Sequence, residues 1–239
     1  MTSPTPLRRV ERVRHELKRR RLTVRHVEAL TPHFRRITFT DDSLGDFVSA
    51  SFDDHIKVFV DDARRDYTPR SFDNAARELV LEFALHGDGP VAEWAGNAVP
   101  GDALDIGGPK GSLIVPLDYD WHLLAGDETA FPAVARRLEE LPAGARAIVI
   151  LQAADAADRR DFKTAADARI TWVSTDAELQ DAVRALTLPD GEGYAWCAGE
   201  AGAMAALRRE LVEVKGHPGE AIRAAAYWKR GARGHHENL

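Results

Sequence analysis

The feature that most constrains the fold of this chain is a change in its hydrophobic period near the middle of the sequence. In the first half, short runs of alternating, β-branched or aromatic residues are separated by Gly and Pro, which predicts short strands joined by turns. The expected strands span residues 22–27, 36–40, 56–60 and 79–85. Several short strands at this spacing are typical of a small antiparallel barrel.

The second half alternates strand patterns with helix patterns. Strands are expected over residues 121–125, 147–151, 170–173 and 194–197, and helices over 130–141, 177–186 and 201–214. This alternation favours a parallel sheet with helices on its faces. We therefore expect two domains, an antiparallel β-barrel followed by an α/β parallel-sheet domain. The expected boundaries are 1–21 for a basic N-terminal extension, 22–118 for the barrel and 119–239 for the α/β domain.

The predicted parallel sheet also indicates where a ligand would bind. In open parallel sheets, nucleotides bind outside the carboxyl ends of the strands, near the point where the strand order reverses. Gly126, Gln152 and Gly199 each end a predicted strand. These three residues are therefore candidates for ligand contacts.

The composition excludes several classes of protein. Of the 239 residues, 44% are hydrophobic and 29% are charged, which excludes a disordered or fibrous chain. No apolar run approaches the roughly 18 residues of a membrane span, and we see no signal peptide. The single cysteine, Cys197, excludes internal disulfides and multi-cysteine metal sites, and the nine histidines show no metal-ligand spacing. We expect a cytoplasmic protein, because one unpaired cysteine fits a reducing compartment.

The net charge of −6 hides a basic arm on an acidic body. Residues 1–36 carry 11 Lys and Arg against 3 Asp and Glu, a net +8, and residues 37–239 carry 21 against 35, a net −14. Such an arm suits nucleic acid, an anionic membrane surface, an anionic ligand or simply a solvated helix. We favour the helix, because Val10, Val13 and Leu17 form a narrow stripe at helical spacing. Aromatic residues that would stack on bases are not interleaved with the basic ones.

The strongest cluster of chemically useful residues is Arg65-Asp66-Tyr67-Thr68-Pro69-Arg70. A tyrosine ring can stack on a planar heterocycle, a hydroxyl can hydrogen-bond a ring nitrogen, and guanidinium groups can bind phosphate. The alternative is a strand edge that carries two solvated arginines.

Two glycine-rich segments follow. His86-Gly87-Asp88-Gly89-Pro90 lies between a predicted strand and a helical stretch at 91–95. A turn that opens a helix presents backbone N–H groups suited to a pyrophosphate, although an ordinary strand-to-helix turn has the same pattern. The second segment, Gly107-Gly108-Pro109-Lys110-Gly111-Ser112, lacks the usual ending of a phosphate loop.

Taken together, these segments resemble a known family. Residues 65–70, 86–94 and 108–111 resemble the flavin domain of the siderophore-interacting proteins. Those proteins are NAD(P)H-dependent ferric-siderophore reductases within the ferredoxin-reductase-like superfamily. The segments 54–57, 126–133, 196–200 and 227–231 are similar to further parts of the family pattern. The matches run in family order from about Leu22 to Gly231.

The resemblance implies FAD as a cofactor and NADH or NADPH as the electron donor. Tyr67 would pack against the isoalloxazine ring, and Thr68 would approach its N5. The phosphates would be held by Arg65 and Arg70, and the flavin site would be completed by His86, Gly87, Gly89 and Trp94. The nicotinamide nucleotide would lie beside Gly126, Asp127, Glu128, Thr129, Gly199 and Glu200. No residue is assigned as a catalytic acid or base, because hydride and electron transfer need none.

The implied substrate is a ferric siderophore, a small iron chelate that we expect to be anionic. Basic side chains near the flavin would attract it, and the candidates are Lys57, Lys229 and Arg230. The resemblance begins after the basic arm, so the arm's expected role narrows to helping to draw such a chelate. We expect a monomer that binds no nucleic acid.

Some features leave choices open. The connection 61–65 is short, and Ala92 stands where relatives often have a hydroxyl residue. Asp155 after the strand 147–151 favours NADH, whereas Arg159 and Arg160 suit the 2′-phosphate of NADPH. The alternatives to a ferric-siderophore reductase are a general flavin or ferredoxin reductase and a non-catalytic siderophore-binding protein, because fold does not determine substrate.

Overall fold

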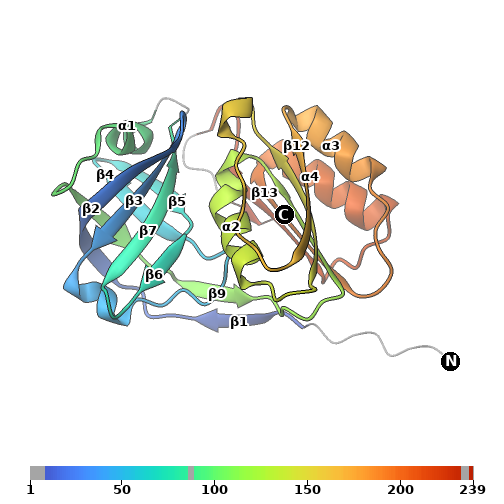
Figure 1. Ribbon diagram of the computed structural model, residues 1–239, viewed down its shortest axis with the longest axis horizontal. Coiled ribbons are helices and arrows are strands. Elements are labelled where there is room, and N and C mark those ends of the chain that lie inside the picture. Colours follow the sequence, from blue (N-terminus) through green and yellow to red (C-terminus); the bar gives the residue numbers. More distant parts are fainter. Residues whose placement is uncertain (1–8, 86–88, 233–236, 239) are drawn as a thin grey trace.

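The protein folds into two domains that lie side by side (Figure 1). The computed structural model describes residues 9–85, 89–232 and 237–238. An antiparallel half-barrel forms the N-terminal domain, and a mainly parallel sheet with helices forms the C-terminal domain. This is the fold class that the change of period predicts.

The half-barrel is a sheet of seven antiparallel strands in the order β5-β4-β8-β2-β3-β7-β6. Its strands are β2 (Arg19–Thr31), β3 (Phe34–Thr40), β4 (Ile56–Val60), β5 (Ala63–Tyr67), β6 (Ser71–Asp73), β7 (Glu78–Ala84) and β8 (Ala103–Gly107). The sheet ends at β5 on one side and at β6 on the other, and residues 68–70 connect these two edges. The barrel therefore opens at the segment that carries the Tyr67-Thr68 pair.

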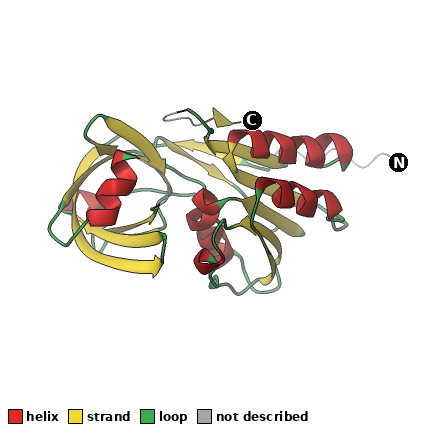
Figure 2. Cartoon of the chain, turned by 90° about the horizontal axis from the view of Figure 1, so that it is seen from above, coloured by secondary structure: helices red, strands yellow, loops and turns green. Residues whose placement is uncertain are grey.

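The short helix α1 (Pro90–Asn97) belongs to the half-barrel, and Figure 2 shows it apart from the helices of the other domain. Its buried face, Val91 and Ala95, joins the apolar core that the barrel strands enclose. The helix begins at Pro90, whose ring suits the first helical position. Packing thus fixes where the first turn of α1 points.

The C-terminal sheet has the order β12-β11-β10-β13-β14-β15. Its strands are β10 (Trp121–Gly126), β11 (Arg146–Gln152), β12 (Asp167–Val173), β13 (Gly193–Glu200), β14 (Ile222–Trp228) and β15 (Glu237–Asn238). The first five are parallel, and β15 pairs antiparallel with β14. The chain order reverses between β10 and β13, so the topological switch point lies at the carboxyl ends of these two neighbouring strands.

Helices cover both faces of the parallel sheet. On the face toward the half-barrel, α2 (Phe131–Glu140) packs Phe131, Val134 and Leu138 into one core, which also takes in Phe34 and Phe52 of the first domain. On the other face lie α3 (Asp176–Ala185), α4 (Ala201–Arg209) and the π-turn Glu210–Val214 that extends α4. No helix within the described ranges is long and apolar enough to cross a bilayer.

Outside the basic arm, each strand and helix expected from the sequence is present, longer or shorter by a few residues. The basic arm differs, because the expected solvated helix is wrong. Instead, β1 (Glu11–Arg14) pairs antiparallel with β9 (Gly111–Ile114), and the two strands run along one side of both domains (Figure 1). The partner strand lies about a hundred residues away, so the local spacing does not reveal it.

The arm is also continuous with the barrel. β2 begins at Arg19, so a boundary at residue 21 falls inside that strand. Arg12 and Arg14 are exposed and Val13 is half-buried, which is the period of a strand. A Cβ atom on Gly111 would lie 2.5 Å from the carbonyl oxygen of Val13, so glycine permits this close pairing.

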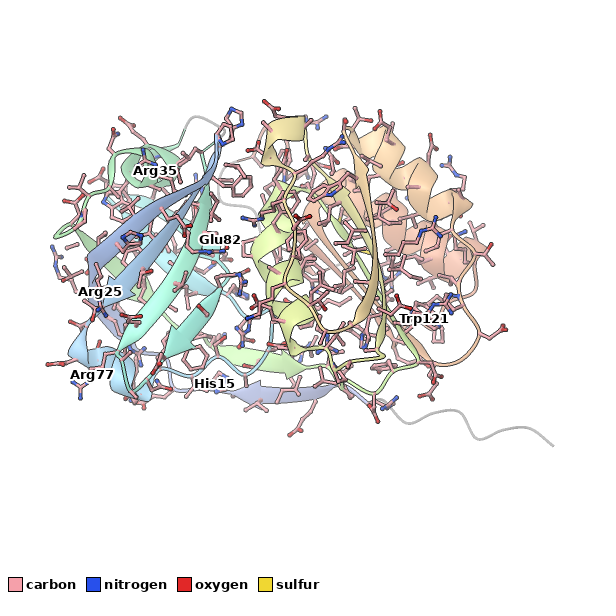
Figure 3. The ribbon with its side chains drawn as sticks, in the orientation of Figure 1. His15, Arg25, Arg35, Arg77, Glu82 and Trp121 are labelled. Carbon is pink, nitrogen blue, oxygen red and sulfur yellow. The ribbon has the colours of Figure 1, made fainter. Side chains whose placement is uncertain are left out.

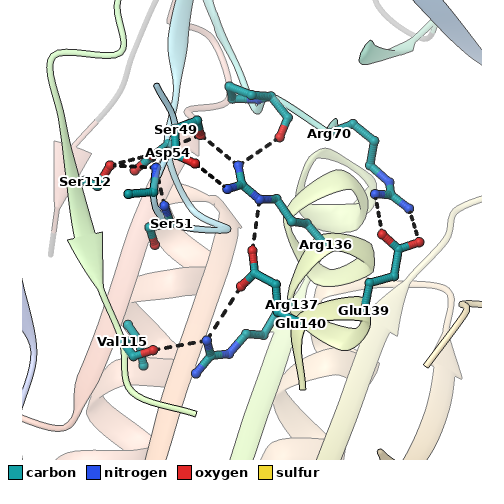
Figure 4. Close-up of polar contacts among 12 residues, drawn as sticks. Ser49, Ser51, Asp54, Arg70, Ser112, Val115, Arg136, Arg137, Glu139 and Glu140 are labelled. Carbon is teal, nitrogen blue, oxygen red and sulfur yellow. Dashed lines mark hydrogen bonds and ion pairs between the residues drawn. The ribbon is translucent and has the colours of Figure 1, made fainter. Parts of the chain in front are cut away.

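Three arginines of the α/β domain bond the half-barrel and its linker, and Figure 4 shows the two that lie on α2, Arg136 and Arg137. Arg136 donates from Nη2 to the carbonyl of Ser49 at 2.7 Å and from Nη1 to its hydroxyl at 2.8 Å. Arg137 donates to the carbonyls of Val115 at 3.1 Å and Pro116 at 2.7 Å. The third, Arg160, reaches Glu82 on β7, with 2.6 Å between Nη2 and Oε2.

The β2–β3 hairpin makes a further contact between the domains, with Asp158 at the end of the 3-10 turn Ala156–Asp158. Thr31 Oγ1 lies 2.6 Å from Asp158 Oδ1, and His33 Nδ1 lies 2.8 Å from Oδ2. The hydrogen bond that His33 donates to the Asp158 carboxylate raises the pKa of His33. Burial would raise the pKa of Asp158, but the hydrogen bonds from Thr31 and His33 outweigh it and lower that pKa.

This contact predicts a pH dependence of stability. A raised folded-state pKa of His33 means that its stabilisation is complete below about pH 6.5 and is lost as the pH rises through the folded-state pKa. We expect the midpoint of urea unfolding of the wild type to fall as the pH rises through this range. In His33→Gln, this fall should be absent. His26→Gln, an exposed position on β2, is the control. An unchanged pH profile in His33→Gln would contradict the prediction.

Candidate active site

A cavity of about 560 Å³ lies between the two domains. This volume is within the range of small-molecule and cofactor sites, roughly 300–1,000 Å³. Among the residues expected at the site, the half-barrel contributes Arg65, Tyr67, Thr68 and Gly89 to its wall, and the α/β domain contributes Asp127, Glu128, Thr129 and Arg230. Residues of the two walls that are 38 to 165 positions apart in the chain thus meet in one cavity.

Other expected residues lie elsewhere. Gly126, Gly199 and Glu200 shape the switch point behind the wall, and Lys57, Lys229, Arg70 and Trp94 are outside the lining of the cavity as the structure describes it. His86 and Gly87 fall outside the described residues. Their expected contacts with FAD therefore stay predictions.

The barrel wall is built on the last residues of β5. The ring of Tyr67 packs with its centroid 4.6 Å from that of Phe83, and burial raises the pKa of its hydroxyl. Thr68 is buried at the start of the segment that crosses the barrel opening. Arg65 donates to the carbonyl of Arg64 at 2.9 Å and makes no ion pair with any described residue. Its guanidinium is therefore available for an anion in the cavity.

The start of α1 forms the next part of this wall. Gly89 is the N-cap residue and offers no side chain to cap the helix, and Val91 and Ala92 line the cavity beside it. A Cβ atom on Gly89 would meet no atom of the described residues within 4 Å, so that part of the chain leaves the helix start accessible. The first turn of a helix carries N–H groups without helical partners and favours an anion.

These residues fit FAD. An aromatic ring, a buried hydroxyl, an arginine with no carboxylate partner among the described residues, and a helix start without a side-chain cap suit a flavin with a pyrophosphate. Ala92 supplies no hydroxyl for a phosphate, so the backbone of this turn and Arg65 would hold it.

Arg70 and Trp94 have packing roles in the structure. Both terminal nitrogens of Arg70 bond Glu139 on α2, at 2.8 and 2.6 Å (Figure 4). Burial would lower the pKa of Arg70, but the bonds to Glu139 and the charge of Glu82 raise it. Trp94 stacks on Phe39 in the barrel core, with 6.2 Å between ring centroids. Their contacts with the flavin phosphates and ring stay predictions.

The α/β wall is organised by the buried carboxylate of Asp127, just after β10. Its Oδ1 accepts from the backbone and hydroxyl of Thr129 at 2.9 and 2.5 Å. Its Oδ2 accepts from the backbone of Glu200 at 2.9 Å and from the indole of Trp228 at 2.8 Å. Burial raises the pKa of Asp127 against these hydrogen bonds. One side chain thus joins the ends of β10, β13 and β14.

The positions of Glu200 and Gly199 depend on these bonds of Asp127. Glu200 caps α4 by accepting from the backbones of Gly202 at 2.6 Å and Ala203 at 3.0 Å. Burial would raise its pKa, but these bonds and one from the Arg230 backbone lower it. Gly199 has φ of +151°, and a Cβ atom there would collide with the carboxylate of Asp127. Glycine at this position leaves room for the Asp127 bonds.

Two of the residues considered for the choice between NADH and NADPH, Asp155 and Arg160, already make contacts within the fold. Asp155 caps the turn that follows it, accepting from Ala157 at 2.8 Å. Arg160 is held by Glu82 and lies over the rings of Phe34 and Phe131. Of the two arginines considered for a 2′-phosphate, only Arg159 is exposed, 3.3 Å from the hydroxyl of Ser174.

Sequence reasoning missed several residues of the cavity wall: Asp66, Glu82, Asp176, Tyr227 and Trp228. Asp66 and the Tyr227-Trp228 pair lie in segments that match the family pattern, but neither was assigned a role. Glu82 is a charged residue inside an otherwise apolar strand, which is a signal of a buried ion pair. It lies on β7 toward the α/β domain (Figure 3).

The fold and the cavity define a two-domain flavin and nicotinamide protein, and the comparisons agree. A model of the siderophore-interacting FAD-binding domain matches residues 23–65 and 61–113, and one of the siderophore-interacting protein matches 119–231. The NADPH-dependent ferric-chelate reductase of Escherichia coli is 34% identical over 91% of this chain and 96% of its own length.

Solved structures show the same relationship. A siderophore utilization protein from T. fusca is 33% identical, with a TM-score of 0.86 over 96% of this chain and 98% of that one. The ferredoxin reductase of carbazole 1,9a-dioxygenase shares the fold, with a TM-score of 0.67 at 18% identity over 86% of this chain and 68% of that one. The chain belongs to the siderophore-interacting protein family.

The close packing at the switch point predicts that one methyl group added at Gly126 lowers the stability of the fold. A Cβ atom on Gly126 would lie 2.7 Å from Cβ of Ala130 and closer still to the carbonyl of Ala198. We expect Gly126→Ala to lower the free energy of unfolding by about 3 kcal/mol, because the backbones of β10 and β13 cannot separate there. Thermal unfolding measures this loss.

Gly96→Ala is the matched control. A Cβ atom at this position in α1 meets nothing within 4 Å. Alanine favours a helix over glycine, so we expect a gain of about 0.5–1 kcal/mol. Equal stability of the two variants would show that Gly126 is not held at the close approach.

Proposed function

We propose that this protein is an FAD-dependent ferric-siderophore reductase, which passes electrons from NADH or NADPH through the flavin to Fe(III) and releases Fe(II) for iron assimilation. The observation that carries the proposal is the cavity between the barrel opening and the switch point of the parallel sheet. It brings flavin-type residues of one domain against nucleotide-type residues of the other. The relatives named as a ferric-chelate reductase and a siderophore utilization protein support the substrate class.

When bound, FAD supplies a group that takes two electrons as hydride and gives them up singly, which matches a nicotinamide donor to Fe(III). The chain's own part is geometric. In this proposal Tyr67 and Thr68 orient the ring, and Arg65 with the start of α1 binds the phosphates; the position of these residues in the cavity wall supports it. On the other wall, Glu128 and Thr129 border the space for the nicotinamide nucleotide.

The two walls are held so that this space keeps its shape. Glu128 Oε1 accepts from the backbone of Ala154 at 2.6 Å, and Thr129 is fixed by Asp127. Apolar side chains, among them Phe34, Val91 and Pro132, complete the wall. Pre-organised walls of this kind keep the donor close to the acceptor without a proton-transfer residue.

We also propose that the protein acts as a monomer in the cytoplasm. NADH and NADPH are supplied in that compartment, and the one cysteine, Cys197, is buried and unpaired. Both proposals are open to measurement by mass photometry and cell fractionation.

The activity is tested directly. Protein loaded with FAD, given NADH or NADPH without oxygen, should reduce a ferric siderophore, with Fe(II) trapped by a ferrous chelator. Turnover with free FMN in place of the chelate is the control for a general flavin reductase. No Fe(II) with any siderophore tested would refute the proposal, and turnover on FMN alone would favour the general reductase.

Replacing Arg65 should weaken the binding of FAD specifically. Arg65→Ala removes charge-assisted hydrogen bonds to phosphate, so we expect the dissociation constant of FAD to rise about tenfold or more. Arg64→Ala is the matched control, because Arg64 is exposed on the same strand and lies outside the cavity lining. Titration of apo-protein with FAD, followed by flavin fluorescence, measures both. Equal affinities of the two variants would remove Arg65 from the phosphate site.

A further inference from the structure

Two of the three basic residues expected to attract the siderophore already have acidic partners. Lys57 and Asp66 face each other across β4 and β5, and their side chains form an ion pair. Arg230 forms an ion pair with Asp176 at the start of α3, with 3.1 Å between Nη2 and Oδ2. Both partners, Asp66 and Asp176, line the cavity.

The burial of Asp66 strengthens its effect on Lys57. Its side chain is only 12% exposed, whereas that of Lys57 is 39% exposed. Its carboxylate also lies near enough to Tyr227 on β14 to act on the pKa of that hydroxyl. Asp66 therefore lies between Lys57 and the cavity. A charged ligand in the cavity interacts with the Asp66 carboxylate as well as with the Lys57 ammonium group.

The rest of the described lining adds no positive excess. The described lining as a whole contains five acidic side chains, Asp66 and Asp176 included, against two arginines, Arg65 and Arg230. Glu82 is balanced by arginines outside the lining, and Asp127 is held by four donors. If Arg65 binds a flavin phosphate as proposed above, its charge is used as well, and the phosphates of both nucleotides add negative charge.

The charge of a ferric chelate depends on its ligand class. Three hydroxamates, each singly deprotonated, neutralise Fe(III), and a free amine on the backbone makes the chelate cationic. Three catecholates, each doubly deprotonated, leave a charge of −3. A site without positive excess repels the second class and accepts the first, since like charges in a low-dielectric cleft are costly.

We propose that Asp66 and Asp176 are specificity-determining residues, which set the substrate class to neutral or cationic ferric trihydroxamates over tris-catecholates. This rests on the proposed function and departs from the expectation of an anionic chelate drawn by a basic surface. Asp66 acts through Lys57, and Asp176 acts through Arg230. Neither takes part in electron transfer.

The test measures binding separately from reduction. Gallium(III) chelates have the same charge as the ferric ones, and Trp228 in the cavity wall provides a fluorescence signal for their binding. For the FAD-loaded wild type, we expect a cationic gallium trihydroxamate to bind more tightly than a gallium tris-catecholate. Added salt should weaken the first and strengthen the second, because it screens attraction and repulsion respectively. Tighter binding of the tris-catecholate, weakened by salt, would overturn the proposal.

The variants are Asp66→Asn and Asp176→Asn. Each frees a basic side chain, so we expect the affinity ratio of tris-catecholate to trihydroxamate to rise by more than about threefold. Threefold is the effect of one pair of unit charges at about 6 Å in water, and the two chelates differ by three or four charges. Asp181→Asn is the matched control: Asp181 pairs with Arg184 on the same helix as Asp176 and lies outside the cavity lining. An unchanged ratio in both Asp66→Asn and Asp176→Asn would overturn the proposal.

The two proposals can fail separately. If no ferric chelate of either class is reduced, the proposed function fails whatever the gallium chelates show. If ferric chelates are reduced but the salt response or the Asn variants behave otherwise than expected, only the specificity proposal fails. Asp176, on the surface at the start of α3, keeps the test informative should Asp66→Asn impair folding or FAD affinity.

Discussion

The buried carboxylate of Glu82 is the group on which the junction of the two domains depends. Arg36 bonds it from the barrel at 2.8 Å, and Arg160 bonds it from the α/β domain at 2.6 Å. A carboxylate buried to this extent is costly without cationic partners, and separating the domains would remove Arg160 and leave only the barrel partners Arg36 and Arg70. Arg160 also lies over Phe34 and Phe131, one ring from each domain. The cavity exists because this junction holds its two walls at a set distance.

Within the α/β domain, Asp127 has the corresponding role. It gathers the ends of three strands, and the glycines at 126 and 199 permit the close approach that its bonds require. Several residues expected to contact a cofactor therefore build the site, and others line it. Thr129 and Glu128 line the cavity, whereas Gly126, Gly199 and Glu200 shape the backbone behind it. A family motif can therefore contain residues that line the site and residues that shape the backbone behind it.

Much of the site was predictable where the signal is local. The segment from Arg65 to Thr68 lies on one strand and its exit, and Asp127 to Thr129 lies on one turn, so both reach the cavity together. Arg70 and Trp94 were harder to place, because their partners Glu139 and Phe39 are 69 and 55 positions away in the chain. The pairing of Lys57 with Asp66 depends on the register of β4 against β5, which the residue types alone do not specify.

The sequence by itself determined the two kinds of domain, the strands and helices within them, and the turns from which ligand-binding residues project. These features follow from hydrophobic period and from Gly and Pro, which act over a few neighbouring residues. Only the tertiary structure decided that the basic arm is a strand, which basic side chains are neutralised, and which expected contacts line the cavity. Those outcomes depend on groups that meet through space after the chain has folded, and Coulomb energy and strand pairing depend on that distance.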